Sequence, residues 1–252
     1  MIKDIIEAFK NWLRDQQPVL IPIPVRKSPD QKKNAHPGVQ KYGIAVLLVL
    51  MGLSPFVPDT LNAQANQQGE LKTILFLGDS ITAGYGLDET QAFPALVEEK
   101  IKAAGHNYRV VNAGLSGETS SGGLRRIGWL LRSRVDILVL ELGANDGLRG
   151  INLEVTRDNL QKIIDQTRQK YPDVKIVLAG MQVPPNLGDT YTRTFREMFP
   201  SLARTNNAHL IPFILEGVAG DPALNLPDGI HPNVEGQKIL ARNVWNVLGP
   251  IL

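Results

Sequence analysis

Apolar runs of two kinds alternate along the chain from residue 71 to its end. Short, nearly continuous apolar runs predict strands at 73–77, 108–112, 136–142, 174–179 and 209–213. Apolar positions at helical spacing predict helices at 91–104, 124–131, 153–170, 192–205 and 234–248. Strands without polar alternation, separated by helices, are typical of a parallel sheet covered on both faces. We therefore predict an α/β fold for residues 71–252: a three-layer α/β/α sandwich around a flavodoxin-like, doubly wound parallel sheet of five strands.

The residues before 71 have a different pattern. Residues 1–42 read as an arm, with apolar positions at helical spacing that predict an amphipathic helix, followed by a polar, proline-rich linker. Residues 43–65 follow a basic flank and join an 11-residue apolar run to Ala63-Gln64-Ala65, as a secretory signal peptide does. We expect export to the periplasm or the medium, with a mature chain from Asn66. If the signal stays uncleaved, we expect a membrane anchor, and we expect membrane contact only through this segment.

The amino-acid composition limits which partners and catalytic groups the protein could use. The 252 residues include 27 Lys or Arg and 25 Asp or Glu, so the charges nearly cancel and no nucleic-acid partner is indicated. The sequence has no cysteine, which excludes disulfides, thiolate zinc sites and a cysteine nucleophile. It has four histidines, so few side chains could act as a catalytic imidazole.

Polar or small residues with possible catalytic roles follow several of the predicted strands. Ser80 follows the first predicted strand, Gly117 the second and Asn145 the third, while Asp228 and His231 lie beyond the fifth. The carboxyl ends of parallel strands share one edge of the sheet, where open α/β sheets bind their ligands. We therefore expect these five residues to line one crevice.

A serine hydroxyl is a poor nucleophile unless a base removes its proton, and His231 is the base that the sequence offers. The other histidines lie in the arm, in a helix-to-strand turn and at the amino end of a strand: His36, His106 and His209. Asp228 precedes His231 by three residues, so one turn can bring its carboxylate to the far nitrogen of the imidazole. The backbone N–H groups of Ser80 and Gly117 and the Asn145 amide could then stabilise an oxyanion.

Each of these residues also has an ordinary structural interpretation. Ser80 could be a helix N-cap or part of a phosphate-binding turn, and His231 could cap the last helix. Gly117 and Asn145 could be turn residues. We interpret Asp79 and Asp146 as structural hydrogen-bonding groups of their loops. The structural interpretations do not explain why these residues converge on one sheet edge.

Four blocks of the sequence resemble those of the SGNH (GDSL-type) hydrolases, in the same order. They are Gly78-Asp79-Ser80, Gly117 within residues 112–119, Gly143-Ala144-Asn145-Asp146, and Asp228-Gly229-Ile230-His231. Within the family, residues 141–150 and 228–233 are most similar to the bacterial multifunctional acyl-CoA thioesterase, lysophospholipase and arylesterase group. The resemblance spans residues 71–252. It implies that Ser80 is the nucleophile, His231 the general base and Asp228 its orienting partner, with Gly117 and Asn145 in the oxyanion hole.

These roles predict a serine ester hydrolase that forms an acyl-enzyme on a small ester or thioester substrate. We expect it to be a monomer that requires no metal and no organic cofactor. By analogy of position with the family's loops, Val183–Thr190 is expected to border the acyl pocket. One alternative is a carbohydrate O-acetylesterase of the same fold. The other is a non-catalytic flavodoxin-like module that binds phosphate at the Ser80 turn, which would need neither Asp228 nor His231.

Overall fold

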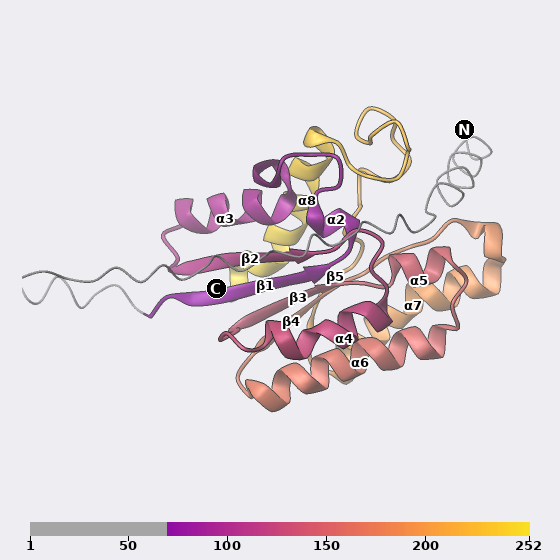
Figure 1. Ribbon diagram of the computed structural model, residues 1–252. Coiled ribbons are helices and arrows are strands. Elements are labelled where there is room, and N and C mark those ends of the chain that lie inside the picture. The colour runs from indigo at the N-terminus through magenta and orange to yellow at the C-terminus, as the bar shows by residue number, and fades with distance from the viewer. Residues whose placement is uncertain (1–69) are drawn as a thin grey trace, which may run out of the picture. The chain divides into compact units, whose positions relative to one another are not determined.

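A five-stranded parallel sheet forms the centre of the chain in a computed structural model, which describes residues 70–252 (Figure 1). The strands are β1 (Lys72–Gly78), β2 (Tyr108–Gly114), β3 (Ile137–Glu141), β4 (Lys175–Ala179) and β5 (His209–Ile211). Their order across the sheet is β2-β1-β3-β4-β5, and every neighbouring pair is parallel. This is the flavodoxin-like order, so the predicted fold class is confirmed.

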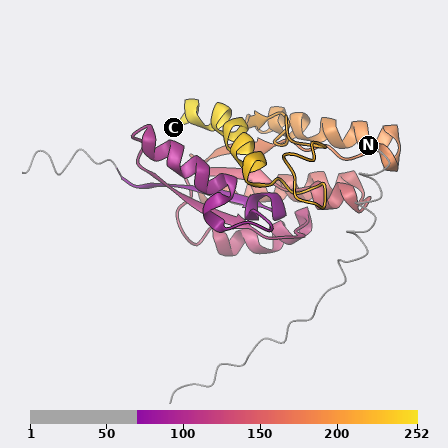
Figure 2. The ribbon, with the colours of Figure 1, turned by 90° about the horizontal axis from the view of Figure 1, so that it is seen from above.

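Helices cover both faces of the sheet, as Figures 1 and 2 show. The long helices are α3 (Phe93–Ala103), α4 (Ser120–Leu130), α6 (Leu153–Lys170), α7 (Asp189–Thr205) and α8 (Val234–Leu248). Helices α3 and α8 pack together on one face, while α4, α6 and α7 lie on the other. The short elements are α2 (Ser80–Ala83), α5 (Ala144–Leu148) and the 3₁₀ turns η2 (Glu89–Gln91), η3 (Pro185–Leu187) and η4 (Gly249–Ile251).

The strand order reverses between β1 and β3. The chain leaves β1 toward α3 on one face and leaves β3 toward α6 on the other, so the two connections separate at the carboxyl ends of these strands. Open α/β sheets bind their ligands at such a point. Ser80 follows β1 and Asn145 follows β3, so both residues lie beside this crevice.

Burial explains why β1 and β3 occupy the middle of the sheet. All five residues of β3 are buried, and in β1 only Lys72 is exposed. Two central strands with apolar side chains on both faces need helices on both sides of the sheet. Buried apolar side chains of the surrounding helices complete the core with those of the strands. The central strands hold their carboxyl ends in a fixed register, with Gly78 opposite Glu141.

Several predicted boundaries differ from the structure by a few residues, and two of these differences have clear local reasons. Helix α4 begins at Ser120, four residues before the predicted start, because the Thr119 side chain accepts a hydrogen bond from the Gly122 N–H and caps the helix. The sequence did not indicate this start because Gly122 and Gly123, which follow it, are poor helix formers. Strand β5 ends at Ile211, two residues earlier than predicted, because Pro212 has no N–H to donate to the sheet.

The predicted amphipathic helix, linker and signal-like segment of residues 1–65 lie outside the described residues. Within residues 70–252, no helix is both long and apolar enough to cross a membrane.

Candidate active site

Ser80, His231 and Asp228 form a continuous hydrogen-bonded chain at the carboxyl end of the sheet. His231 Nε2 lies 2.9 Å from Ser80 Oγ, and His231 Nδ1 lies 2.7 Å from Asp228 Oδ2. An ionised Asp228 places the imidazole proton on Nδ1, which leaves Nε2 to accept a hydrogen bond from the Ser80 hydroxyl. Only 7% of Ser80 and 2% of His231 are exposed, so the pair is largely shielded from water.

The Ser80 hydroxyl is available to His231 because a neighbouring residue caps the helix. Asp79 is the N-cap of α2, and its carboxylate accepts a hydrogen bond of 2.9 Å from the Ile81 N–H. Ser80 is therefore the first residue of the helix and not its cap, which removes the N-cap interpretation. The one-turn helix α2 ends at Ala83, and its C-cap Gly84, with a φ of 72°, reverses the chain.

A tight loop before α8 fixes Asp228 against His231. Asp228 Oδ1 accepts hydrogen bonds from the backbone N–H groups of Ile230 (2.9 Å) and His231 (3.0 Å), while Oδ2 faces the imidazole. Burial alone would raise the pKa of Asp228, but these hydrogen bonds outweigh it and hold the pKa below its ordinary value. Asn233 caps α8, so His231 is not needed as that helix's cap.

One aromatic residue at this site was not predicted from the sequence. The ring of Tyr85 lies with its centroid 4.5 Å from that of His231, at an interplanar angle of 36°. Its backbone N–H donates to the Ser80 carbonyl (3.0 Å), which ties it to the α2 turn. Tyr85 is 43% exposed, so it presents an aromatic surface beside the imidazole.

Gly117 and Asn145 approach the same strand ends from the loops after β2 and β3. Gly117 has a φ of 76°, a left-handed conformation that favours glycine. Within residues 70–252, neither the Ser80 nor the Gly117 backbone N–H donates a hydrogen bond. Asn145 is 3% exposed, and its Nδ2 donates to Asp79 Oδ2 (3.1 Å), which orients the amide and leaves a second N–H.

Asp146 holds the Asn145 segment in place. It is fully buried, and its carboxylate accepts hydrogen bonds from the Ser120 N–H (2.8 Å), the Ser120 hydroxyl (2.5 Å) and the Thr156 hydroxyl (3.2 Å). These bonds join α5 to the first turns of α4 and α6. Asp146, like Asp79, therefore has the structural role predicted for it.

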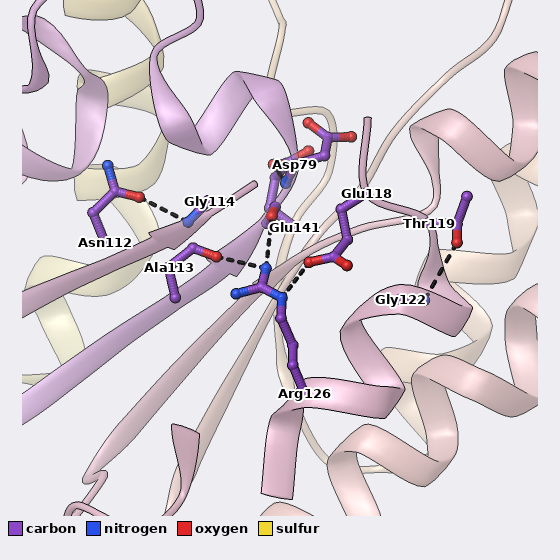
Figure 3. A network of polar contacts seen from close by, with 10 residues as sticks. Asp79, Asn112, Ala113, Gly114, Glu118, Thr119, Gly122, Arg126 and Glu141 are labelled. Carbon is purple, nitrogen blue, oxygen red and sulfur yellow. Dashed lines mark hydrogen bonds and ion pairs between the residues drawn. The ribbon is translucent and has the colours of Figure 1, made fainter. Parts of the chain in front are cut away.

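A pair of buried carboxyl groups lies beneath the Ser80 turn, where the sequence predicted none (Figure 3). Glu141 Oε2 accepts from the Asp79 N–H (3.2 Å) and from the Thr82 hydroxyl (2.7 Å). A Cβ at Gly78 would overlap Thr82 Oγ1 and the Glu141 carboxylate, so only glycine fits there. Burial raises the pKa of Asp79 to about 7, and burial together with the charge of Asp79 raises the pKa of Glu141 well above its ordinary value.

These raised pKa values predict that stability falls as the pH rises. Between the ordinary acidic range and pH about 7, the folded protein keeps protons that the unfolded chain has lost, so the free energy of unfolding decreases across this interval. Glu141→Gln removes one titrating group and keeps an oxygen for Thr82 and Asp79. We expect the fall in Tm between about pH 5 and 8 to be smaller in this variant by a few degrees, since about 1 kcal/mol shifts Tm by roughly 2–4 °C in a domain of this size.

Thermal unfolding at several pH values would measure this effect. Glu197→Gln, at an exposed position on α7, is the matched control and should keep the wild-type pH dependence. A Glu141→Gln curve parallel to that of the wild type would contradict the buried-pair interpretation.

The structure brings the predicted site residues to one sheet edge. His209 starts β5 at the opposite edge, and His106 precedes β2. No group of three or more potential metal-ligating side chains (His, Cys, Asp or Glu) occurs within residues 70–252. Glu141 could have been noticed as a single acidic residue in an apolar strand, whereas Tyr85 carries no comparable sequence signal.

Comparisons with known sequences and structures find similar proteins. The model of the GDSL-like Lipase/Acylhydrolase family matches residues 76–239. The esterase TesA of Pseudomonas aeruginosa is 41% identical over 187 residues, which cover 74% of this chain and 92% of that protein. Thioesterase 1/protease 1/lysophospholipase L1 of Escherichia coli K12 is 37% identical, over 71% of this chain and 85% of that protein. A crystal structure of TesA superposes with a TM-score of 0.69 at 41% identity, over 72% of this chain and all of the other.

Proposed function

The chain belongs to the GDSL-like lipase/acylhydrolase family and is a carboxylic ester hydrolase, and on that premise we propose that Ser80, His231 and Asp228 are its catalytic triad. The observation that carries the proposal is the 2.9 Å contact between His231 Nε2 and Ser80 Oγ, with Asp228 2.7 Å behind the ring. A nucleophile, a base and an orienting carboxylate in hydrogen-bond reach are the arrangement that acyl transfer requires. Phosphate binding at the Ser80 turn would not require the contacts of Ser80 with His231 or of His231 with Asp228.

In the proposed reaction, His231 Nε2 takes the Ser80 proton while Oγ attacks the carbonyl carbon of the ester. The tetrahedral intermediate then collapses, the bond to the leaving group breaks, and the imidazolium gives its proton to the departing alcohol or thiol. Water attacks the acyl-enzyme with His231 again as base, and the acid leaves as Ser80 regains its proton. Asp228, with its pKa below the ordinary value, stays ionised and stabilises the imidazolium in both steps.

Three N–H groups are available for the oxyanion in this proposal. They are the backbone N–H groups of Ser80 and Gly117 and the second Nδ2 hydrogen of Asn145, which Asp79 orients through the first. Because Asp79 also caps α2, one carboxyl group fixes both the nucleophile's helix and the oxyanion donor.

The proposed substrates are small aryl and alkyl esters and acyl thioesters, with lysophospholipids as a further class. The names of the relatives support this range, since one is an esterase and another a thioesterase and lysophospholipase. Val183–Thr190 is the proposed border of the acyl pocket. Val183 is buried close to Gly147, and Leu187 lies near Gly150, so this connection packs beside the segment that carries Asn145.

A substrate panel combined with one variant tests this function. The full-length protein should hydrolyse p-nitrophenyl acetate, butyrate and octanoate and the matched thioesters. Asn145→Ala should lower kcat on every active substrate by about 10²–10³-fold with little change in KM, as loss of an oxyanion donor does. Asn246→Ala, at an exposed position on α8, is the control and should keep wild-type rates. Hydrolysis confined to acetylated sugars would instead favour the O-acetylesterase, and a wild-type kcat in Asn145→Ala would contradict its role.

A further inference from the structure

Arg126 reaches from α4 to the carboxyl ends of β1 and β2 and to the loop that joins β2 to α4 (Figure 3). Its Nη2 donates to the carbonyl oxygens of Gly78 (3.2 Å) and Ala113 (2.6 Å), and its Nε pairs with Glu118 Oε2. The Glu118 side chain is 6% exposed and that of Arg126 23%, so this ion pair is largely removed from water. A planar guanidinium is suited to join several acceptors at fixed angles, which a lysine cannot do.

The acceptors of Arg126 lie next to the residues proposed for catalysis. Gly78 precedes Ser80 by two residues, and Glu118 directly follows Gly117. The guanidinium therefore cross-links the turn that carries the nucleophile to the loop that carries an oxyanion donor. We propose that Arg126, through its pairing with Glu118, is a positioning residue that holds the Gly117 N–H in register with Ser80.

This inference rests on the proposed function and on how few side chains hold the loop that contains Gly117. The loop is attached at its start, where the Leu115 N–H donates to the Gly78 carbonyl (3.0 Å), and at its end, where Thr119 caps α4. Between these points the Glu118 N–H donates to the Leu115 carbonyl (3.1 Å) and closes a turn around Gly117. At Gly117 itself, Arg149 Nη2 donates to the carbonyl oxygen (3.2 Å) from an exposed side chain. Apart from the turn itself, the buried side chain next to Gly117 is that of Glu118, whose carboxylate is held by Arg126.

Helix α4 does not depend on Arg126 for its place. The Ser120 N–H is bound by Asp146, Asn159 Nδ2 donates to the hydroxyls of Ser120 (3.0 Å) and Ser121 (2.9 Å), and Ile127 is fully buried. Loss of the guanidinium should therefore leave the helix packed and release the loop.

The chain offers a matched pair of variants on adjacent positions. Arg126→Gln removes the guanidinium that joins the loops, and Arg125→Gln removes an exposed one from the same helix. We expect Arg126→Gln to lower kcat by roughly 10–100-fold, short of the loss of an oxyanion donor itself, with KM changed less than about threefold. The inhibition constant of an alkylboronic acid, which forms a tetrahedral adduct, should rise in proportion to the loss of kcat/KM. Arg125→Gln should match the wild type in all three.

A second variant displaces Glu118 and leaves every charge in place. A Cβ at Gly122 would overlap Glu118 Oε1, so Gly122→Ala should push the carboxylate away from Arg126, while alanine itself favours the helix. We expect the same pattern of lowered kcat, preserved KM and weakened boronate binding. If Arg126→Gln does not fold, Gly122→Ala decides the question.

Wild-type kcat in Gly122→Ala or in folded Arg126→Gln would overturn this inference, as would a lower Tm with unchanged kinetics, which marks a purely structural pair. Ser80→Ala, measured in parallel, distinguishes a failure of the positioning role of Arg126 from a failure of the proposed function. If Ser80→Ala is inactive and Arg126→Gln is normal, the positioning role fails and the proposed function stands. If Ser80→Ala is active, the proposed function itself fails.

Discussion

Ser80→Ala is expected to lower kcat for p-nitrophenyl butyrate by about 10⁴–10⁶-fold, with the remaining rate supplied by substrate binding and the oxyanion donors. The reason is that Oγ is the atom in contact with His231 Nε2, and alanine leaves the base with nothing to activate. Fold and pocket should change little, because the Asp79 carboxylate that caps α2 stays in place. Steady-state rates with an unchanged Tm would establish that chemistry alone is lost.

Ser133→Ala is the control for this experiment. It removes an exposed hydroxyl from the turn after α4, and it should leave kcat and KM unchanged. Ester hydrolysis by Ser80→Ala within about tenfold of the wild-type rate would show that another residue, or water alone, attacks the substrate.

Asp228→Asn is expected to lower kcat by about 10⁴-fold, the second large effect. The carboxylate accepts the Nδ1 proton and stays ionised because its pKa lies below the ordinary value. An asparagine amide can donate to Nδ1 instead, which favours the tautomer with the proton on Nε2, where the Ser80 proton must go. Substrate binding should persist, so KM should change far less than kcat.

Asp221→Asn provides the comparison within the same loop. Asp221 Oδ1 accepts from the Ala223 N–H (2.9 Å), a local bond of the kind that Asp228 makes to Ile230, but it does not face the imidazole. We expect this variant to retain wild-type kinetics. Equal losses in the two variants would mean that the loop's shape matters and the Asp228 charge does not.

The fold could be predicted because its main signals are local. Five apolar runs became the five strands, and the helices predicted at 153–170 and 234–248 have the observed bounds. The one-turn helices α2 and α5 were missed because they are too short for any periodic pattern. At other elements the observed ends differ from the predicted ones by a few residues, but all five predicted strands are present in the sheet.

The site could be predicted only in part, because some of its contacts depend on register and packing. Ser80, Asn145 and His231 follow from their positions after strands. The pairing of Asp79 with Glu141 depends on Gly78 lying opposite Glu141 between β1 and β3. Arg126 cannot be told from Arg125 in the sequence, because only the orientation of α4 against the strand ends decides which of them reaches the site.

The most direct test of the account is covalent labelling of the nucleophile. Incubated with a p-nitrophenyl alkylphosphonate, the full-length protein should release one equivalent of nitrophenolate, lose activity and gain the mass of one phosphonyl group. Peptide mapping should place that group on Ser80 Oγ, and Ser80→Ala should remain unlabelled. Stoichiometric labelling of any other residue with loss of activity, or equal labelling of Ser80→Ala, would contradict the claim that Ser80 is the catalytic nucleophile.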